Sequence, residues 1–142
     1  MNDTTPTMLE ASDDTKTPLR VLLIPLNGPL EFHELNSERS GLETLQKLVG
    51  GYVEAISLPP FIKDGGKATA YIHEEGKYEY PGQDGVNWRA TDYMVPGIGL
   101  FHGDWIAGPM ILAGFDPSTG EHAELPESVI RRARVIERES GR

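Results

Sequence analysis

The stretch LRVLLIPL, residues 19–26, decides the fold of this 142-residue chain. Its apolar side chains follow one another almost without interruption over the length of one strand. A strand with one face in water alternates apolar and polar residues, whereas a strand buried on both faces reads as a continuous apolar run. A second strongly apolar segment, MILAGF, occupies residues 110–115. Both segments are therefore predicted to be strands, and the first of them to be buried on both faces.

Two amphipathic helices are predicted in addition. The first covers residues 40–49, where Ser40 and Glu43 have the spacing of a capping box that satisfies backbone N–H groups at a helix start. A glycine pair at 50–51 ends this helix, because Gly accepts the left-handed backbone conformation without a steric clash. The second helix begins near Pro126, since Pro is favoured in a first turn. The apolar faces consist of Leu42, Leu45, Leu48 and Val49 in the first helix and of Leu125, Val129, Ala133 and Ile136 in the second.

Shorter strands are predicted between these elements, at residues 30–35, 52–58 and 68–74. A tight hairpin turn at 75–76 is predicted to lead into a further strand at 77–80. The pattern as a whole indicates an α+β fold. We expect a small, mostly antiparallel or mixed sheet that packs against one short central helix and a C-terminal helix.

One domain is expected, because lone domains most often have about 100–150 residues. It is predicted to cover residues 19–138. Residues 1–18 are predicted to be a disordered acidic tail, since they hold too little apolar surface to offset the entropy of ordering. Residues 139–142 are predicted to be a frayed C-terminus.

The composition excludes several classes of protein. Without Cys the chain can form no disulfide framework, no thiolate-ligated metal site and no Cys nucleophile. A net charge of -9 argues against broad binding to nucleic acid or anionic lipid, which needs clustered cations. No apolar run approaches the roughly 20 residues of a membrane-spanning helix, and the N-terminus lacks the pattern of a secretory signal. A cytoplasmic protein without membrane contact is expected.

Five arginines lie within residues 131–142, on and after the predicted C-terminal helix. Such a cluster can contact phosphate groups. Cations near the end of a helix also complement its macrodipole. Because the rest of the chain is acidic, we interpret these arginines as a solvated helix face.

Histidines and carboxylates are the residues from which a metal site could be built. His73 and Glu75 stand two residues apart at the end of a predicted strand, so they share one face of it. His102 stands two residues before Asp104, and His122 follows a turn. Two His and a carboxylate can ligate a divalent metal, but none of these has the helical spacing of a zinc-hydrolase motif. The sequence therefore assigns no catalytic residue, no metal ligand and no cofactor, and it favours a protein that is not an enzyme.

An aromatic-rich segment, residues 78–105, is a candidate binding surface. Aromatic rings interleaved with polar side chains suit contacts with flat ligands or with proteins. The same rings could equally fold back over the sheet as part of the core. They belong to Tyr78, Tyr80, Trp88, Tyr93, Phe101 and Trp105.

Four short motifs resemble those of a known family. Residues 45–54 read LQ-x-x-VGGYVE, residues 73–77 read HEEGK, residues 87–90 read N-x-RA and residues 104–108 read D-x-I-x-G. In this order they resemble domain-of-unknown-function family 3846, a family of small proteins from bacteria, plasmids and phages. The resemblance covers residues 19–130. It implies a single small α+β domain and an origin on a mobile element or in an actinobacterial-type genome, and it implies no activity.

The positions that characterise this family suggest a candidate site. A polar set on a compact scaffold could line one pocket, with Arg89 as the group that reads an anion. The same positions could equally serve turns and helix caps. They correspond to Gln46, Gly50, Gly51, Glu54, Glu74, Glu75, Gly76, Asn87 and Arg89. Together with the aromatic segment they give the candidate ligand-binding residues Glu54, Glu74, Asn87, Trp88, Arg89 and Trp105.

The leading hypothesis is a small cytosolic accessory protein that holds a small anionic or nucleotide-like ligand, or a host protein. One alternative is a metal-assisted hydrolase that uses His73, His102 and a nearby carboxylate. Another is an acidic mimic of nucleic acid that inhibits a DNA-binding protein. Nucleic acid and membranes are not expected as partners, and a homodimer is left open.

Overall fold

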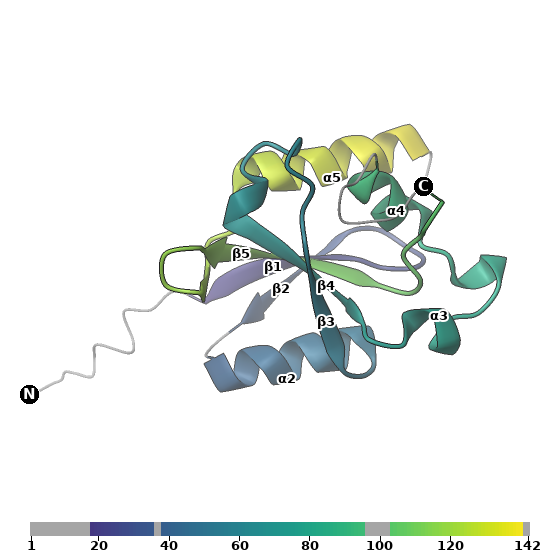
Figure 1. Cartoon of the computed structure of the whole chain (residues 1–142), viewed down its shortest axis with the longest axis horizontal. Coiled ribbons are helices and arrows are strands. Elements are labelled where there is room, and N and C mark those ends of the chain that lie inside the picture. The colour runs from purple at the N-terminus through teal and green to yellow at the C-terminus, as the bar shows by residue number, and fades with distance from the viewer. Residues whose placement is uncertain (1–17, 36–37, 96–102, 141–142) are drawn as a thin grey trace, which may run out of the picture.

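The chain forms a six-stranded antiparallel sheet with helices on both faces (Figure 1). This is seen in a computed structural model, which describes residues 18–35, 38–95 and 103–140. The strands are β1 (Leu19–Ile24), β2 (Glu31–Leu35), β3 (Val53–Ser57), β4 (Ala68–His73), β5 (Met110–Asp116) and β6 (Glu121–Ala123). The helices are α2 (Glu38–Val49), α3 (Gly76–Glu79), α4 (Trp88–Met94) and α5 (Glu127–Ser140), with 3₁₀ turns η1 (Gly65–Lys67) and η2 (Gln83–Gly85). The α+β class predicted from the sequence is confirmed.

The two ends of the chain are described only in part. Residues 1–17, which make up nearly all of the expected tail, and residues 141–142 at the expected frayed end lie outside the described residues. Among the helices that the structure describes, none is both long enough and apolar enough to cross a bilayer.

The sheet is organised around β5. The strand order is β2-β1-β5-β4-β3, and β6 pairs with the end of β5. One edge of β5 is shared, because β1 pairs with residues 110–112 and β6 with residues 114–116. The other edge of β5 pairs with β4 from residue 110 to residue 114. The strand in the middle of the sheet therefore comes late in the chain.

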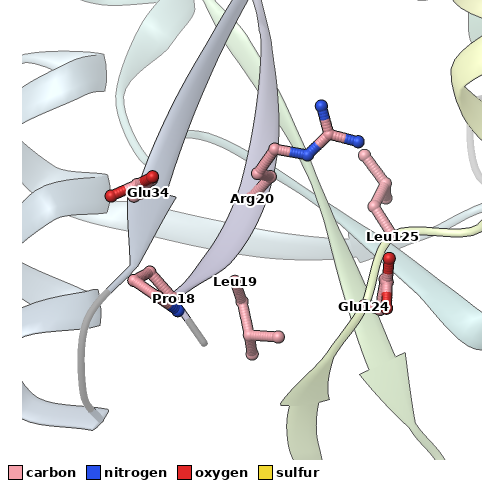
Figure 2. A pocket seen from close by; sticks show the side chains of 6 residues that line it. All are labelled: Pro18, Leu19, Arg20, Glu34, Glu124 and Leu125. Carbon is pink, nitrogen blue, oxygen red and sulfur yellow. The ribbon is translucent and has the colours of Figure 1, made fainter. Parts of the chain in front are cut away.

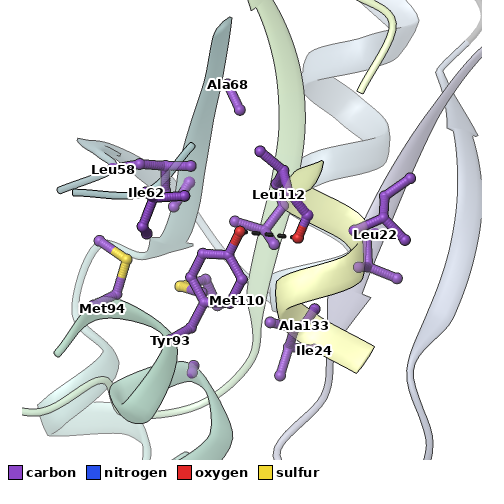
Figure 3. Close-up of a cluster of buried hydrophobic side chains, with 14 of the residues drawn as sticks. Leu22, Ile24, Leu58, Ile62, Ala68, Tyr93, Met94, Met110, Leu112 and Ala133 are labelled. Atoms are coloured by element: carbon purple, nitrogen blue, oxygen red, sulfur yellow. Dashed lines mark hydrogen bonds between the residues drawn. The ribbon is translucent and has the colours of Figure 1, made fainter. Parts of the chain in front are cut away.

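Two hydrophobic cores lie on opposite faces of this sheet. Leu22 and Ile24 of β1 pack in the core covered by α4 and α5, whereas Val21 and Leu23 pack in the core covered by α2. The larger core contains Tyr93 of α4, whose hydroxyl donates a hydrogen bond of 3.0 Å to a backbone carbonyl of α5 (Figure 3). All four of these β1 side chains are buried. The predicted burial of this strand on both faces is confirmed.

α2 differs from its predicted form at its start and on its apolar face. It begins at Glu38, two residues before Ser40, so the prediction that Ser40 caps it is wrong. Glu and Arg are good helix formers, and they extend the helix backwards past the capping-box sequence. Leu45 and Val49 are buried as predicted, but Leu42 is 50% exposed. The stripe that meets the sheet starts instead at Gly41, which lies against Leu35 of β2.

The predicted strand at residues 77–80 is wrong. The chain forms the short helix α3 there instead of a hairpin. A returning strand would need a free edge of β4, and both edges of β4 are already paired, with β3 and with β5. Gly76 lets the chain turn close to the next layer, since a Cβ at this position would lie 2.7 Å from the carbonyl oxygen of Ala107.

The arginines of α5 do not all lie on a solvated face. Arg131, Arg134 and Arg138 are exposed, as expected. The guanidinium of Arg132 instead donates hydrogen bonds to the carbonyl oxygens of Tyr93, at 2.7 Å, and Val95, at 3.3 Å. These carbonyls belong to the end of α4, where helical partners run out. Arg132 therefore joins α5 to α4, which a periodicity argument within one helix cannot show.

The junction between α2 and β3 follows the sequence prediction. Gly50 has φ +87°, and the N–H groups of Gly50 and Gly51 both bond to the carbonyl oxygen of Gln46, at 2.9 and 3.0 Å. A Cβ at Gly51 would lie 2.5 Å from Nε2 of His73. The first glycine is needed for its backbone conformation, and the second leaves room for the buried His73 ring.

Replacing Gly50 by Ala is expected to lower the free energy of unfolding by about 1–2 kcal/mol, because a Cβ is disfavoured at positive φ. Gly66→Ala is the control, because a Cβ at this exposed loop position meets nothing within 4 Å. That change should alter stability by less than about 0.5 kcal/mol. Thermal unfolding of both variants beside the wild type measures the difference. Equal melting temperatures would contradict the role of Gly50 in ending α2.

Candidate functional site

The six candidate residues do not line one pocket. Glu54 lies on the edge strand β3, Glu74 directly follows the neighbouring strand β4, and both are exposed. Arg89 is buried beside the end of β1, and two strands lie between β1 and β3. With about 4.8 Å between neighbouring strands, β3 is about 14 Å from β1. Glu54 and Arg89 therefore do not form the pair that could have anchored an anion pocket.

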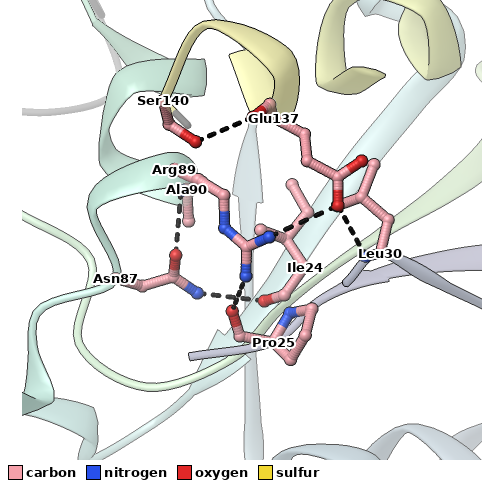
Figure 4. Close-up of polar contacts among 8 residues, drawn as sticks. All are labelled: Ile24, Pro25, Leu30, Asn87, Arg89, Ala90, Glu137 and Ser140. Atoms are coloured by element: carbon pink, nitrogen blue, oxygen red, sulfur yellow. Dashed lines mark hydrogen bonds and ion pairs between the residues drawn. The ribbon is translucent and has the colours of Figure 1, made fainter. Parts of the chain in front are cut away.

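Asn87 is buried, with only 1% of its surface exposed, and it joins three parts of the chain (Figure 4). Its side-chain oxygen accepts a hydrogen bond of 3.0 Å from the backbone N–H of Ala90, which makes it the N-cap of α4. Its side-chain nitrogen donates to the carbonyl oxygens of Ile24 and Gly108, each at 2.9 Å. An amide offers two donors and an acceptor, and here all of them are used within the protein.

Arg89 is also committed to the fold, with 4% of its surface exposed. One guanidinium nitrogen donates to the carbonyl oxygen of Pro25 at 2.8 Å, and another lies 3.5 Å from a carboxylate oxygen of Glu137 in α5 (Figure 4). The same carboxylate oxygen accepts the backbone N–H of Leu30 at 3.0 Å. Arg89 and Glu137 thus fasten the connection between β1 and β2 to α4 and α5, and this guanidinium does not face a ligand.

The two tryptophans are the aromatic members of the candidate set, and both lie at the surface. Trp88 is 49% exposed and Trp105 is 40% exposed. The backbone brings them together, because an isolated antiparallel bridge joins Val86 to Ala107 and the N–H of Asn87 donates to the carbonyl oxygen of Ile106. Trp88 directly follows Asn87 as the first residue of α4, and Trp105 directly precedes Ile106, so their backbone positions are near one another.

Lys77 of α3 holds the ring of Trp105 in place. Its ammonium lies 4.3 Å from the centre of that ring and also forms an ion pair with Asp104. The hydrogen bond from Lys77 lowers the pKa of Asp104, and the N–H of Trp105 donates to the same carboxylate at 2.8 Å. We call Lys77, Trp88 and Trp105 the tryptophan patch.

The other rings of the aromatic segment serve the interior or lie elsewhere. Tyr93 is fully buried in the core, and Tyr80 packs so closely on Gly108 that a Cβ there would lie 2.6 Å from its ring. Tyr78 is exposed, and Phe101 lies outside the described residues. The core interpretation therefore holds for Tyr93, whereas Tyr78, Trp88 and Trp105 are exposed and stay candidates for a binding surface.

The metal-assisted alternative finds no support in the part of the chain that the structure describes. No group of three His, Asp or Glu residues there could hold a metal ion. Nδ1 of His73 accepts the backbone N–H of Glu75 at 2.9 Å, within a local turn. His102, the second expected ligand, lies outside the described residues.

Comparison with known proteins places the chain in a family. Residues 19–138 match the model of the family described as domain of unknown function DUF3846. The chain belongs to this family. Neither a curated protein nor a solved structure matches it. The resemblance predicted from the four motifs is confirmed.

In this DUF3846 domain the motif residues that the structure explains serve turns and caps. Gly50 ends α2, Gly76 approaches the backbone before β5, and Asn87 caps α4. Arg89 joins the layers, as described above. The turn-and-cap interpretation therefore accounts for Gly50, Gly76 and Asn87, and a contact between layers accounts for Arg89. The exposed candidates are the two tryptophans, Glu54 and Glu74.

Two shallow hollows lie away from the tryptophan patch. One, of about 230 Å³, opens where β1 and β6 diverge and is lined by Leu19, Arg20 and Leu125 among others (Figure 2). The other, of about 340 Å³, lies over β3, β4 and β5, with Tyr71 and Phe115 in its lining. Neither set of lining residues includes one of the six candidates. Sequence reasoning missed both hollows, because each is formed by strands that pair over long separations in the chain.

Tyr71, beside the second hollow, is hydrogen-bonded to His122 of β6, with 2.8 Å between the hydroxyl oxygen and Nε2. Burial lowers the pKa of His122 below its ordinary value of 6.5 and raises that of Tyr71. The His122 ring is therefore neutral in the folded protein at pH 7.

Acidification is expected to destabilise this DUF3846 domain through His122. The unfolded chain takes up the proton near pH 6.5, whereas the folded chain takes it up only at lower pH. The stability that His122 contributes is thus full above pH 6.5 and is lost as the pH falls through its folded pKa. Urea unfolding at about pH 7.5 and about pH 5 should show a larger loss of stability for the wild type than for His122→Gln. Parallel losses would contradict this role.

Asn87→Ala is expected to lower the free energy of unfolding by about 2–4 kcal/mol, because it removes a helix cap and leaves buried carbonyls without a donor. Trp88→Ala is the matched control at the next position, where about half of the side chain is exposed and no buried hydrogen bond is lost, so a smaller change is expected. Chemical denaturation measures both. A loss at Asn87 no larger than that at Trp88 would show that the amide does not join the layers.

Proposed function

We propose that this DUF3846 domain is a small accessory protein that holds a protein partner on the tryptophan patch. The observation that carries the proposal is that Trp88 and Trp105, the only tryptophans in the chain, flank a backbone hydrogen bond between Asn87 and Ile106 and are each close to half exposed. Trp is enriched among the few residues that dominate the energy of protein interfaces. Exposing two such rings costs free energy unless a partner covers them.

The patch stands on a rigid base, which favours binding. Asn87, directly before Trp88, is fixed by hydrogen bonds of its side chain to three backbone groups. Trp105 is fixed by Lys77 and by Asp104. A surface that is already ordered loses little conformational entropy when it binds. The buried candidate residues thus support the exposed ones.

A protein partner fits this surface better than a small anion does. The guanidinium of Arg89 is occupied within the fold, and the ammonium of Lys77 is paired with Asp104. Asp92 is exposed on α4 one turn after Trp88, so the two side chains are neighbours on the helix. A partner segment with an apolar side chain and a nearby Lys or Arg would complement this arrangement.

The setting of this function is also part of the proposal. The net charge of -9 and the absence of Cys suit a protein that acts in the reducing cytoplasm. The resemblance to phage and plasmid proteins suggests that the gene belongs to a mobile element and that the partner is a host protein. The genes beside it would distinguish such an element from a chromosomal background.

The proposal is tested by capturing partners with the wild type and with the double variant Trp88→Ala, Trp105→Ala. Partners are sought in two sources: host lysate, and purified candidate proteins that carry Lys or Arg beside apolar residues. Leu42→Ala is the control, because Leu42 is similarly exposed but lies on α2. The wild type and the control should capture the same protein, and the double variant should lose at least about tenfold in affinity, in line with the loss of two central anchors.

Tryptophan fluorescence gives an independent reading, because both fluorophores belong to the patch. The emission should shift to shorter wavelength when the captured protein is added, since the rings leave water. An unchanged spectrum on binding, or equal capture by the double variant, would place the interface elsewhere. Binding that is abolished by moderate salt and unaffected by the double variant would favour the acidic mimic of nucleic acid instead.

A further inference from the structure

We propose that the outer edge of β3 pairs with the same edge of a second copy of this chain, which gives a two-fold dimer with one continuous sheet. β3 is the last strand in the sheet order, and its inner edge pairs with β4. In the part of the chain that the structure describes, no strand pairs with its outer edge. This surface is separate from the tryptophan patch.

The hydrogen-bonding groups on the outer edge can be assigned residue by residue. The N–H of Glu74 donates to the carbonyl oxygen of Tyr52 at 2.8 Å, so these two residues form a hydrogen-bonded pair next to the β3–β4 ladder. Hydrogen-bonded and non-hydrogen-bonded pairs alternate along an antiparallel ladder. Alternate residues of β3 therefore direct their backbone N–H and C=O groups away from β4. These residues are Val53, Ala55 and Ser57.

The edge has few of the features that prevent strands from pairing. Natural edge strands carry charges, prolines or bulges, or are covered by another element. β3 reads VEAIS, with one charge and no proline, and Glu54, Ala55 and Ser57 are exposed. The opposite edge strand, β2, reads EFHEL and carries two carboxylates. Of the two outer strands, β3 is the one open to a partner.

The edge is complementary to itself, which is why a second copy is the partner we infer. A two-fold axis at Ala55 brings Ala55 of the two copies together as a hydrogen-bonded pair, and it places Val53 opposite Ser57. Glu54 then faces Ile56 of the other copy, so the two carboxylates do not meet. Small side chains lie at the axis, where two backbones approach most closely. A symmetric interface of this kind is isologous and closes on itself.

The flanks of β3 add apolar contact to this pairing. Tyr52 is 72% exposed in the single chain. The same register places it opposite Leu58 of the second copy, whose side chain is buried in its own core, so the neighbouring backbone would shield part of the Tyr52 ring. On the other face, the hollow of about 340 Å³ borders β3 at Ala55 and Ser57. In a dimer the hollows of the two copies would meet across the axis, on the face of the sheet that α2 covers only in part.

The mass of the protein in solution is the first test. Light scattering after size-exclusion chromatography should give twice 15.6 kDa for the wild type, with a shift toward 15.6 kDa on dilution. Ala55→Pro removes one outward N–H and no hydrogen bond to β4, so it should give the single-chain mass with the circular dichroism of the wild type. A wild type that stays at 15.6 kDa at every concentration overturns the proposal.

Disulfide trapping tests the register, and it decides the matter if the proline variant does not fold. The chain has no Cys, so Ala55→Cys introduces its only thiol. A hydrogen-bonded pair has its Cα atoms about 5.5 Å apart, within the range of a disulfide. Ala55→Cys should therefore form covalent dimers under a mild oxidant.

Ser57→Cys is the matched control on the same strand. In the proposed register the two Ser57 positions are displaced by four residues along the strands, or about 13 Å, so they should cross-link at least about tenfold more slowly. Equal rates for the two variants would overturn the pairing at Ala55. Loss of the dimer in the double tryptophan variant would instead show that the tryptophan patch forms the contact between copies.

Discussion

The side-chain amide of Asn87 is the interaction on which the rest of this structure depends. It bonds to the last residue of β1, to the segment that enters β5 and to the first turn of α4. These elements belong to the sheet and to the layer above it, and none is adjacent to another in the sequence. Because the amide is buried, each of these backbone groups would lose a hydrogen bond without it. Arg89, two residues later, extends the same joint to α5 and to the connection before β2.

Much of the fold could be predicted from the sequence because its strongest signals are local. The burial of β1 and the end of α2 are each determined by residues that are neighbours in the sequence. The errors arose where a distant element decided the outcome. Residues 77–80 follow a strand and the turn signal Glu75-Gly76, which together predict a hairpin. However, β5 occupies the edge of β4 that a hairpin would need. Leu42 has the spacing of a core residue, but Gly41 meets the sheet in its place.

Which candidate residues are exposed could be predicted only in part, for a related reason. Aromatic residues in a polar segment indicate a surface, and Trp88 and Trp105 lie there. The same pattern cannot separate them from Tyr93, which enters the core because α4 packs beside α5. Nor could it show that Arg89 faces inward, since its carboxylate partner, Glu137, comes from the far end of the chain. Residue type suggested the chemistry, and long-range packing decided which groups are available for it.

The place of β5 in the sheet has a consequence for how this protein folds as it is synthesised. Two of the three strands that pair with β5, β1 and β4, leave the ribosome before it does, and Leu23 must wait for Ile111 before the two can pair. Contacts between residues so far apart slow folding, because a long loop must close before they form. Until α5 is made, Leu22 and Ile24 of β1 lack much of the layer that covers them in the folded domain, which exposes the nascent chain to aggregation. The domain therefore completes its sheet only once most of the chain has been made, as a single late event.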